Sequence, residues 1–335
     1  MNILKNTAHI VYATDDKFAE ILGVSLTSLY ENSKGMDDII VYILDSGISD
    51  ENKTKIIDLS QKYEYSIPLF IKAKNISDEL GINVSADRGS LSQYARLFIS
   101  SHLPDNLQKV IYLDCDTIVE QSISELWNLD MHGKTIAALM DAFSKHYRKN
   151  IDLSSMDIMF NSGVMLIDLN RWKEQKVENR LLEFISRKRG RIQQGDQGAL
   201  NHVLSNDIFC FEPRFNSVTI FYDFTYQEML IYRKTPEFYP ENLVKEAVEK
   251  PNIIHFTTSI FSKRPWIEGC QHKFSDKWLE YKAKSPWKDV PLWKDNRSFL
   301  KKRLSDCLNV LPRKFSIAFA SLFQAYIRPF IKKYI

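Results

Sequence analysis

The sequence predicts an α/β fold, with a Rossmann-like, mostly parallel sheet flanked by helices. Three apolar runs near its start, at 9–14, 39–44 and 67–71, have the character of strands, and segments of helical length separate them. Strand and helix alternating at these lengths indicate right-handed crossovers between parallel strands. The run Val110–Leu113 is unbroken in its apolar character, as in a strand that is buried on both faces. With 335 residues and 44% hydrophobic content, the chain is long and apolar enough for a globular core.

The segments between the first strands are expected to be helices. Apolar residues recur at helical spacing from about residue 18 to 30, and Ser49 or Asp50 is placed to cap a second helix that ends near Tyr63. No Gly-x-Gly-x-x-Gly motif follows the first strand, which argues against a dinucleotide-dependent dehydrogenase. The polar turn at Asp15 suits recognition of a base or a ribose instead.

The remaining elements follow from the same patterns. Ser90 is placed to cap a helix that carries Tyr94 and Arg96 and leads into the central strand. Beyond that strand the pattern predicts a short helix at 123–127, a strand at 136–140 and a charged loop at 143–156. A strand at 160–168 follows, entered through a bend of small residues. After it the pattern predicts a basic helix at 172–189, a helix opened by residues 195–198 and a last strand at 253–256. Lys263 and Arg264 lie in the loop that follows.

Two carboxylates, Asp114 and Asp116, follow the central strand with one residue between them. In an open α/β sheet, ligands bind at the carboxyl ends of the strands. Two like charges close to an apolar core repel each other and resist desolvation, so a positive group is expected beside them. Oxygen ligands favour magnesium, calcium or manganese over zinc. A divalent cation is therefore one interpretation, and a polar turn in which one aspartate caps the next segment is the other.

Charge is distributed unevenly along the chain. From Arg297 to Ile335, nine Lys or Arg residues stand against Asp306 alone, which gives +8, so the preceding part carries 3 − 8 = −5. The four cysteines form no Cys-x-x-Cys pair, which argues against a disulfide scaffold or a zinc ribbon and fits a reducing cytoplasm. The first eight residues lack the apolar core of a signal peptide, and no run of 18 apolar residues is present to span a membrane.

The basic tail, residues 286–335, also has an apolar side. Apolar residues recur at helical spacing between Phe299 and Leu311, and an aromatic-rich segment follows Pro312. Because basic amphipathic segments bind anionic membrane surfaces, the tail is expected to hold a cytoplasmic protein on the inner face of the cell membrane. The alternative is a helix folded back on the body or a dimer contact. Nucleic acid is not an expected partner, since the apolar side is too rich for a phosphate-binding arm.

Six motifs together resemble family 8 glycosyltransferases, the retaining enzymes that include bacterial lipopolysaccharide galactosyl- and glucosyltransferases and glycogenin. In chain order they are Tyr12-Ala13-Thr14-Asp15-Asp16, Tyr94-Ala95-Arg96-Leu97, Tyr112-Leu113-Asp114-Cys115-Asp116, Phe160-Asn161-Ser162-Gly163-Val164, Asp196-Gln197 and Ile254-His255-Phe256. The resemblance covers roughly residues 7–270. It implies a GT-A fold over residues 1–285, with a nucleotide-sugar half at about 1–120 and an acceptor half at about 121–285, followed by the tail.

The resemblance also implies ligands and the residues that bind them. A manganese or magnesium ion would be bound by Asp114, Asp116 and His255. The donor would be UDP-galactose or UDP-glucose, with its uridine at Ala13, Thr14 and Asp15 and its diphosphate at Lys263 or Arg264. The donor sugar would lie among Arg96, Asn161, Asp196 and Gln197. Gln197 would lie beneath the anomeric carbon. Cys115 would contribute mainly its backbone, and Arg88 completes the cofactor-binding set. The implied acceptor is a glycan, a glycolipid or a glycoprotein.

The chemistry of this set is consistent with sugar transfer. A metal that bridges the oxygens of a leaving diphosphate stabilises its developing charge, so no protonated acid is needed there. Gln197 is a poor nucleophile, which favours front-face attack by the acceptor hydroxyl, whereas Asp196 stays a candidate for a covalent nucleophile. Three of these residues also have structural interpretations: His255 as a packed core residue, Arg96 as an ion-pair partner and Asp196 as a helix cap.

Two other functions stay open at this point. A sugar-nucleotide pyrophosphorylase also joins an α/β sheet to a metal-bound diphosphate, but the turn after the first strand lacks the glycines of such enzymes. A sugar-nucleotide or glycan-binding subunit that supports a partner enzyme is the non-enzymatic alternative. Both aspartates and His255 are present, so nothing in the motifs indicates lost turnover.

Overall fold

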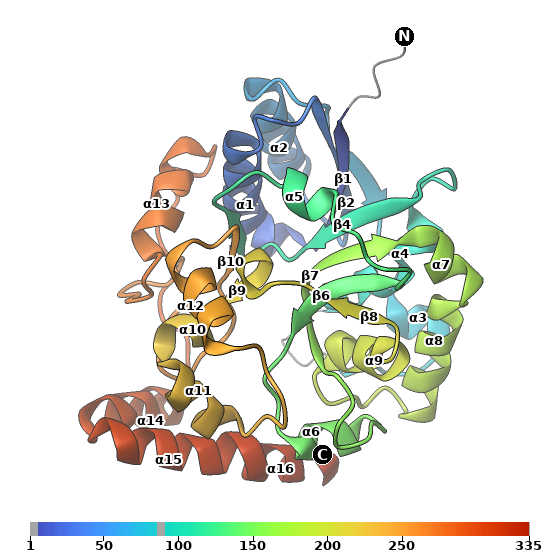
Figure 1. Cartoon of the computed structure of the whole chain (residues 1–335). Coiled ribbons are helices and arrows are strands. Elements are labelled where there is room, and N and C mark those ends of the chain that lie inside the picture. The colour runs from blue at the N-terminus through green and yellow to red at the C-terminus, as the bar shows by residue number, and fades with distance from the viewer. Residues whose placement is uncertain (1–5, 86–90, 335) are drawn as a thin grey trace.

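In the computed structural model, which describes residues 6–85 and 91–334, the strands form two sheets (Figure 1). The larger sheet has seven strands in the order β3-β2-β1-β4-β7-β6-β8. In chain order they are β1 (Thr7–Thr14), β2 (Asp38–Asp45), β3 (Leu69–Lys72), β4 (Lys109–Leu113), β6 (Ile136–Met140), β7 (Phe160–Asp168) and β8 (Ile208–Cys210). The predicted α/β class and the predicted strands of this sheet are confirmed.

The large sheet is parallel except at β7. β1 pairs in parallel with β2 and β4, β2 with β3, and β6 with β8, whereas β7 is antiparallel to both β4 and β6. Between β6 and β7 the register passes from Met165 opposite Ala138 to Asn161 opposite Leu139. Residues 162–164 therefore form a bulge, which is the bend of small residues that the sequence predicts.

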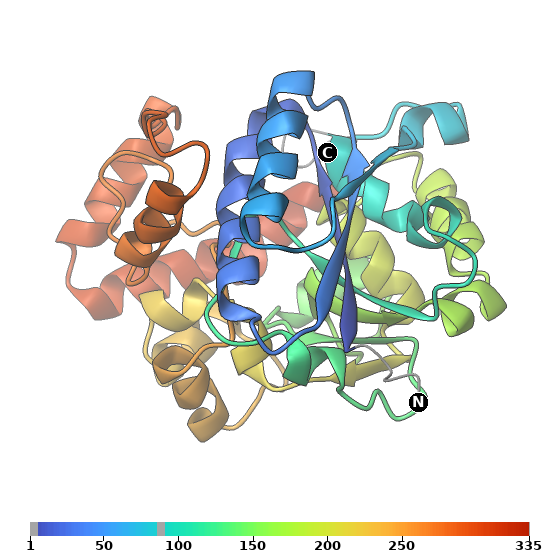
Figure 2. The same ribbon diagram turned by 90° about the horizontal axis from the view of Figure 1, so that it is seen from above.

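Helices cover both faces of the sheet (Figure 2). One face carries α1 (Ala19–Asn32) and α2 (Asp50–Lys62), and the other carries the 3₁₀ helix η2 (Leu91–Phe98), α8 (Val177–Arg187) and α9 (Gly195–Leu204). Because successive side chains of a strand point to opposite faces, Ile10 and Tyr12 of β1 join the core on the first face and Val11 joins the core on the second. The central strands are thus buried on both sides, as their apolar runs predict.

A second sheet joins distant parts of the chain. Its three strands, in the order β5-β10-β9, are β5 (Thr117–Val119), β10 (Ile253–His255) and β9 (Ser217–Val218). β10 is antiparallel to β5, with His255 opposite Thr117, and parallel to β9. The predicted last strand is present, but it belongs to this small sheet, which places His255 beside the residues that follow β4.

The other elements connect these layers. They are η1 (Asp16–Phe18), α3 (Ile76–Leu80), α4 (Ile99–His102), α5 (Ser124–Trp127), α6 (Lys145–Asn150), α7 (Leu169–Glu174), η3 (Pro213–Asn216), α10 (Ile220–Asp223), α11 (Tyr226–Arg233), α12 (Glu241–Glu249) and α13 (Ser275–Lys284).

Three predicted segments differ in detail. The predicted helix with Arg96 is mainly the 3₁₀ helix η2, and its expected cap, Ser90, lies outside the described residues. The predicted basic helix at 172–189 is divided into α7 and α8 by Lys176, whose φ of 51° is left-handed and ends the first helix. The predicted loop at 143–156 contains the short helix α6.

The tail folds back onto the body. Its elements, α14 (Phe299–Val310), α15 (Arg313–Leu322), the π-helical turn η4 (Phe323–Ile327) and α16 (Arg328–Tyr334), lie along the lower edge in Figure 1, next to α11 and α6. Ser321 Oγ donates a hydrogen bond to the carbonyl of Ile231 (2.7 Å), and Arg313 pairs with Glu228 (3.2 Å). Within the described part of the chain, no helix combines the length and the hydropathy needed to cross a membrane. The division at residue 286 stays a prediction.

Candidate active site

A cavity of about 160 Å³ opens where β1 and β4 end. Ten of the predicted site residues line it: Ala13, Thr14, Asp15, Arg96, Asp114, Cys115, Asp116, Asp196, Gln197 and Arg264. Asn161 and His255 are buried behind this wall. His255 lies beside Asp114 and Asp116, and Asn216 joins Asn161 to His255. The predicted residue Arg88 lies outside the described residues.

Three of the lining and buried groups form a compact cluster. An oxygen of Asp114, an oxygen of Asp116 and a ring nitrogen of His255 lie within 4.8 Å of one another. Nε2 of His255 is 3.2 Å from Oδ1 of Asp116 and 3.7 Å from Oδ2 of Asp114. A Cβ atom at Gly163 would lie 2.8 Å from Oδ2 of Asp114 and would overlap the imidazole, so only glycine leaves room for this arrangement.

Hydrogen bonds fix the tautomer of His255. Asn161 Oδ1 accepts from the backbone N–H of Gly163 and from Nδ2 of Asn216, both at 3.0 Å, which orients the Asn216 amide. Oδ1 of Asn216 can then only accept, so the proton that joins it to His255 lies on Nδ1 (3.0 Å). In the neutral form of the imidazole, the lone pair of Nε2 therefore faces the two carboxylates.

This arrangement is suited to a metal ion. The buried Nε2 atom has no hydrogen-bond partner among the described residues, although carboxylate oxygens surround it. Lone pairs that converge in this way repel unless a proton or a metal ion lies between them, and a histidine ligand whose other nitrogen is hydrogen-bonded is the usual arrangement in metal sites. The residues present thus fit a divalent cation.

Asn216 was not identified from the sequence, and it gives the first prediction. Asn216→Ala removes the acceptor that holds His255 Nδ1, and loss of such a supporting bond typically weakens metal binding about 10–100-fold. We expect the dissociation constant for Mn²⁺ to rise by that factor in equilibrium titrations, while Asn128→Ala, an exposed asparagine of the α5 C-terminus, leaves it unchanged. Equal Mn²⁺ affinity in the two variants would contradict the assignment.

Arg96 joins two sides of the site. Its guanidinium lies 2.7 Å from Oδ1 of Asp114 and 3.0 Å from Oδ2 of Asp196, and it donates to the carbonyl of Ser162 (2.9 Å). Burial disfavours its charge, but the neighbouring carboxylates outweigh burial and hold the pKa of Arg96 above its ordinary value. Side chains three residues apart eclipse in a 3₁₀ helix, which is why Gln93 and Arg96 of η2 both reach the cavity. Arg96 is therefore charged and shared between β4 and α9.

Gln197 is positioned by the helix that carries it. Asn201, one turn later in α9, accepts from the backbone N–H of Phe160 (2.7 Å) and donates to its carbonyl (2.9 Å). These bonds fasten α9 to β7, so that the Gln197 amide faces the cavity. Its Nε2 donates to Oδ2 of Asp141 (3.4 Å), and its Oε1 accepts from the N–H of Ser162 (3.5 Å).

Asp141 is a second site residue that was not selected as a candidate from the sequence. It follows β6 directly and is 7% exposed. The rule that ligands gather at strand ends applies to β6 as it does to β4, so a signal was present. This signal was weaker than that of the Asp114–Asp116 pair, because a single carboxylate has no like charge beside it that a cation would offset.

Cys115 and the two basic loop residues take distinct places. Burial raises the pKa of the Cys115 thiol, which stays protonated and points to the carbonyl of Ala13 (3.5 Å). Arg264 lines the cavity and lies 3.4 Å from Oδ2 of Asp116. Lys263 instead donates to the carbonyl of Glu268 (3.0 Å) and lies 3.7 Å from Asp295. Of the two residues, Arg264 is thus the one beside the cluster of Asp114, Asp116 and His255.

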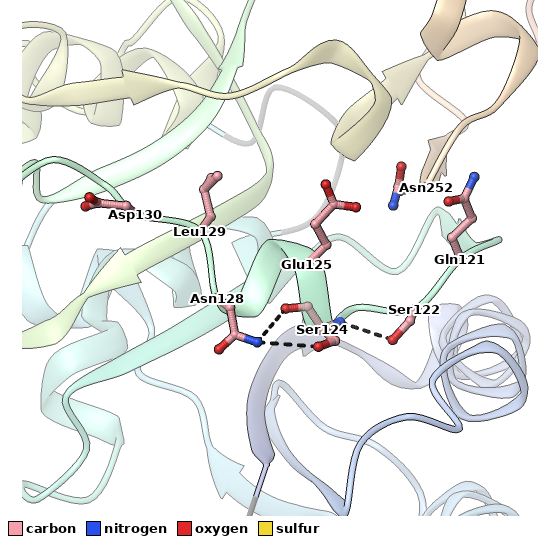
Figure 3. Close-up of a pocket in the computed structure, with 8 residues that line it drawn as sticks. All are labelled: Gln121, Ser122, Ser124, Glu125, Asn128, Leu129, Asp130 and Asn252. Carbon is pink, nitrogen blue, oxygen red and sulfur yellow. Dashed lines mark hydrogen bonds between the residues drawn. The ribbon is translucent and has the colours of Figure 1, made fainter.

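A larger cavity of about 560 Å³ lies elsewhere, around α5 (Figure 3). This cavity is lined by Gln121, Ser122, Ser124, Glu125, Asn128, Leu129, Asp130 and Asn252. Figure 3 shows the hydrogen bonds of Ser124 with Asn128 and Ser122, which hold the α5 turn. Glu125 is already engaged by Arg214. None of these lining residues belongs to the cluster of Asp114, Asp116 and His255. The size of a cavity alone therefore does not identify the candidate active site.

The mostly parallel sheet, with its acid and imidazole cluster at the strand ends, has the arrangement of a GT-A glycosyltransferase fold. Residues 9–269 match the family model of glycosyl transferase family 8, so the chain belongs to this family. The predicted family resemblance is confirmed.

Known proteins with similar sequence or structure include glycosyltransferases. General stress protein A of Bacillus subtilis is 28% identical over 286 residues, covering 84% of this chain and 95% of that protein. Lipopolysaccharide 1,2-glucosyltransferase of Escherichia coli is 26% identical, covering 84% and 79%. The structure of the galactosyltransferase LgtC, solved with donor and acceptor sugar analogues, matches with a TM-score of 0.69 at 24% identity, covering 83% of this chain and 96% of that one. The LgtC likeness supports the fold.

Proposed function

We propose that this chain is a metal-dependent, retaining hexosyltransferase that moves galactose or glucose from a UDP-sugar to a hydroxyl of a glycan, glycolipid or glycoprotein. The observation that supports the proposal most strongly is that Nε2 of His255 faces Asp114 and Asp116 at the edge of a cavity. Membership of a glycosyltransferase family sets the pyrophosphorylase alternative aside.

Asp114, Asp116 and His255 would hold the metal ion. When bound, a divalent cation supplies Lewis-acid stabilisation of the charge that develops on the departing UDP. An imidazole beside two carboxylates shifts the preference from magnesium toward manganese. Arg264, which already pairs with Asp116, is the residue we assign to the diphosphate, because a guanidinium matches phosphate oxygens in charge and geometry.

The remaining residues are assigned to the nucleoside and the sugar. Ala13, Thr14 and Asp15, at the end of β1, would contact uridine, and Asp196 and Gln197 would contact the hexose. The carboxylate of Asp196 is held by Arg96 at 3.0 Å, and this pairing reduces its strength as a nucleophile. We therefore favour front-face transfer, with Gln197 and Asp141 orienting the reacting groups. Asn161 supports His255 through Asn216 in addition to its predicted contact with the sugar.

A donor hydrolysis screen tests this function. Purified full chain is incubated with UDP-galactose, UDP-glucose and other UDP-sugars, with Mn²⁺ or Mg²⁺, and released UDP is measured. Slow release from one donor without an acceptor is the expected result, followed by faster release when extracted glycolipids or glycoproteins are added. If the protein neither binds UDP nor releases it with any metal, the proposal is wrong. Tight binding of UDP without transfer to any acceptor would favour the binding-subunit alternative.

We also propose that the tail attaches the enzyme to the inner face of the cell membrane. Although the tail packs on the body, it keeps large apolar side chains exposed: Phe315 (69%), Phe319 (54%), Leu322 (54%) and Phe330 (65%). These residues recur at helical spacing over α15 to α16, among Arg313, Lys314 and Arg328. An apolar stripe with basic neighbours suits the surface of an anionic bilayer.

The second prediction concerns this stripe. Phe315→Ser/Phe319→Ser in the full chain should weaken binding to phosphatidylglycerol vesicles by about tenfold or more, because burying even part of a Phe side chain contributes on the order of 1 kcal/mol. Ile67→Ser/Leu69→Ser, which removes two exposed apolar side chains near β3, is the matched control and should bind as the unmodified chain does. Higher salt should weaken binding of both, since the basic residues act through screened charge. A full chain that ignores these vesicles at low salt would exclude the membrane role.

A further inference from the structure

A third cavity, of about 350 Å³, lies where the tail meets the body. Its lining comes from the start of α6, from the loop after α6, from the residues that follow α11 and from η4. The lining residues that matter are Lys145, His146, Lys234 and Tyr326. Figure 1 shows α6, α11 and α16 converging at this edge of the molecule.

The cavity is positively charged. Lys145 and Lys234 are exposed, and no carboxylate of the described residues forms an ion pair with either. No acidic side chain is among the described residues that line the cavity. Burial lowers the pKa of His146, and the charges of Lys145 and Lys149 lower it further. Two ammonium groups and an imidazole around one cavity suit an anion, and phosphate is the common biological anion that lysine binds.

The tail holds this cavity in shape. Ser144 Oγ donates to the carbonyl of Ala325 (2.9 Å), and Asn150 Nδ2 donates to the carbonyl of Pro329 (2.7 Å). The rings of His146 and Tyr326 lie 5.1 Å apart. Both ends of α6 are therefore fastened to the tail, and the cavity is complete only when the tail is docked.

The cavity is also close to the site of transfer along the chain. Asp141 contacts Gln197, and Lys145 follows it by four residues, so their Cα atoms are at most about 14 Å apart. That span matches a short oligosaccharide. An oligosaccharide acceptor whose hydroxyl lies near Gln197 would then have a phosphate ester on a neighbouring sugar within this distance of Lys145.

We propose that this cavity, with Lys145 and Lys234, is an acceptor subsite for a phosphate group, so that the natural acceptor is a phosphorylated glycan or a sugar attached to a lipid phosphate. The inference rests on the proposed transferase function, because it names a property of the acceptor. The same cations would also attract the phosphates of a membrane surface. The short connection to Asp141 favours the acceptor as the source of the phosphate.

The test compares two double variants of the full chain. Lys145→Gln/Lys234→Gln removes the two cavity charges, and Lys34→Gln/Lys288→Gln removes the same charge from two exposed lysines that do not line the cavity. Each protein is first saturated with UDP and Mg²⁺, so that the donor diphosphate site is filled, and is then titrated calorimetrically with glycerol 3-phosphate. The dissociation constant should rise about tenfold in the cavity variant, since two exposed charge contacts are lost, and should stay unchanged in the control. Equal affinity in all three proteins overturns the proposal.

Two further measurements separate the alternatives. Binding to phosphatidylglycerol and phosphatidylcholine vesicles is compared for the same proteins. If the cavity variant loses vesicle binding but keeps its affinity for glycerol 3-phosphate, the lysines serve the membrane surface and the acceptor assignment is wrong. Hydrolysis of the UDP-sugar by the unmodified chain is measured in parallel. Its absence, with glycerol 3-phosphate still bound at the lysines, would count against the transferase function and not against the phosphate site.

Discussion

Asp114→Asn and Asp116→Asn are each expected to lower UDP-sugar turnover by about 10²–10⁴-fold while leaving the fold intact. Each variant removes one of the two charged ligands of the cation, and Lewis-acid stabilisation of a developing diphosphate is worth several kcal/mol, at about 1.36 kcal/mol per tenfold in rate. The fold should persist because both side chains lie just after β4, because removing one negative charge relieves repulsion with the other, and because Arg96 keeps its ion pair with Asp196 when Asp114 is replaced. Tyr112 can still donate its hydroxyl hydrogen bond to an amide oxygen at position 114.

Three measurements check this expectation. Turnover is followed across a range of Mn²⁺ concentrations, Mn²⁺ affinity by equilibrium titration, and the free energy of unfolding by denaturant without metal. Asp58→Asn, on an exposed position of α2, is the control and should match the unmodified chain in all three. His255→Ala should weaken Mn²⁺ binding less than either aspartate variant, since it removes a neutral ligand. Near-normal turnover of Asp114→Asn or Asp116→Asn at any metal concentration would remove that residue from the set of ligands.

The sequence located the acidic pair by local rules alone. An unbroken apolar run predicts a buried strand, strand ends collect ligands, and two carboxylates with one residue between them favour a positive group beside them. His255 needed the family resemblance, because its place beside Asp116 depends on the pairing of β10 with β5, which are far apart in the chain. Asn216 could not be found in either way. It precedes β9, a strand of two residues, which is too short to show an alternating pattern.

The tail shows a different limit of sequence reasoning. The apolar and basic spacing predicts amphipathic helices, and the helices are present. The pattern did not show which side is covered. The buried side of α15 carries small or modest residues such as Ser316, Ile317 and Ala320, whereas the large Phe315 and Phe319 stay exposed. Small residues let α15 approach α11 closely, so steric fit decided the docking face.

The second large effect is expected at Arg96. Arg96→Met should lower the free energy of unfolding by about 3–5 kcal/mol, because removing one partner of a buried ion pair leaves its counter-charges uncompensated. Here the uncompensated groups are Asp114 and Asp196, and the carbonyl of Ser162 also loses its donor. Arg96→Lys keeps the charge but cannot contact all three groups at once, so a smaller loss is expected.

Denaturant unfolding without metal measures both variants against a surface control. Arg171→Met breaks the more exposed pair with Asp207, at 3.6 Å, and should cost no more than about 1 kcal/mol. Added Mn²⁺ should restore more stability to Arg96→Met than to the unmodified chain, because a cation beside Asp114 replaces part of the missing charge. A loss as small as that of Arg171→Met, with no extra gain from Mn²⁺, would show that Arg96 does not hold the unliganded site together. Its effect on turnover would then have to arise from contact with the donor sugar alone.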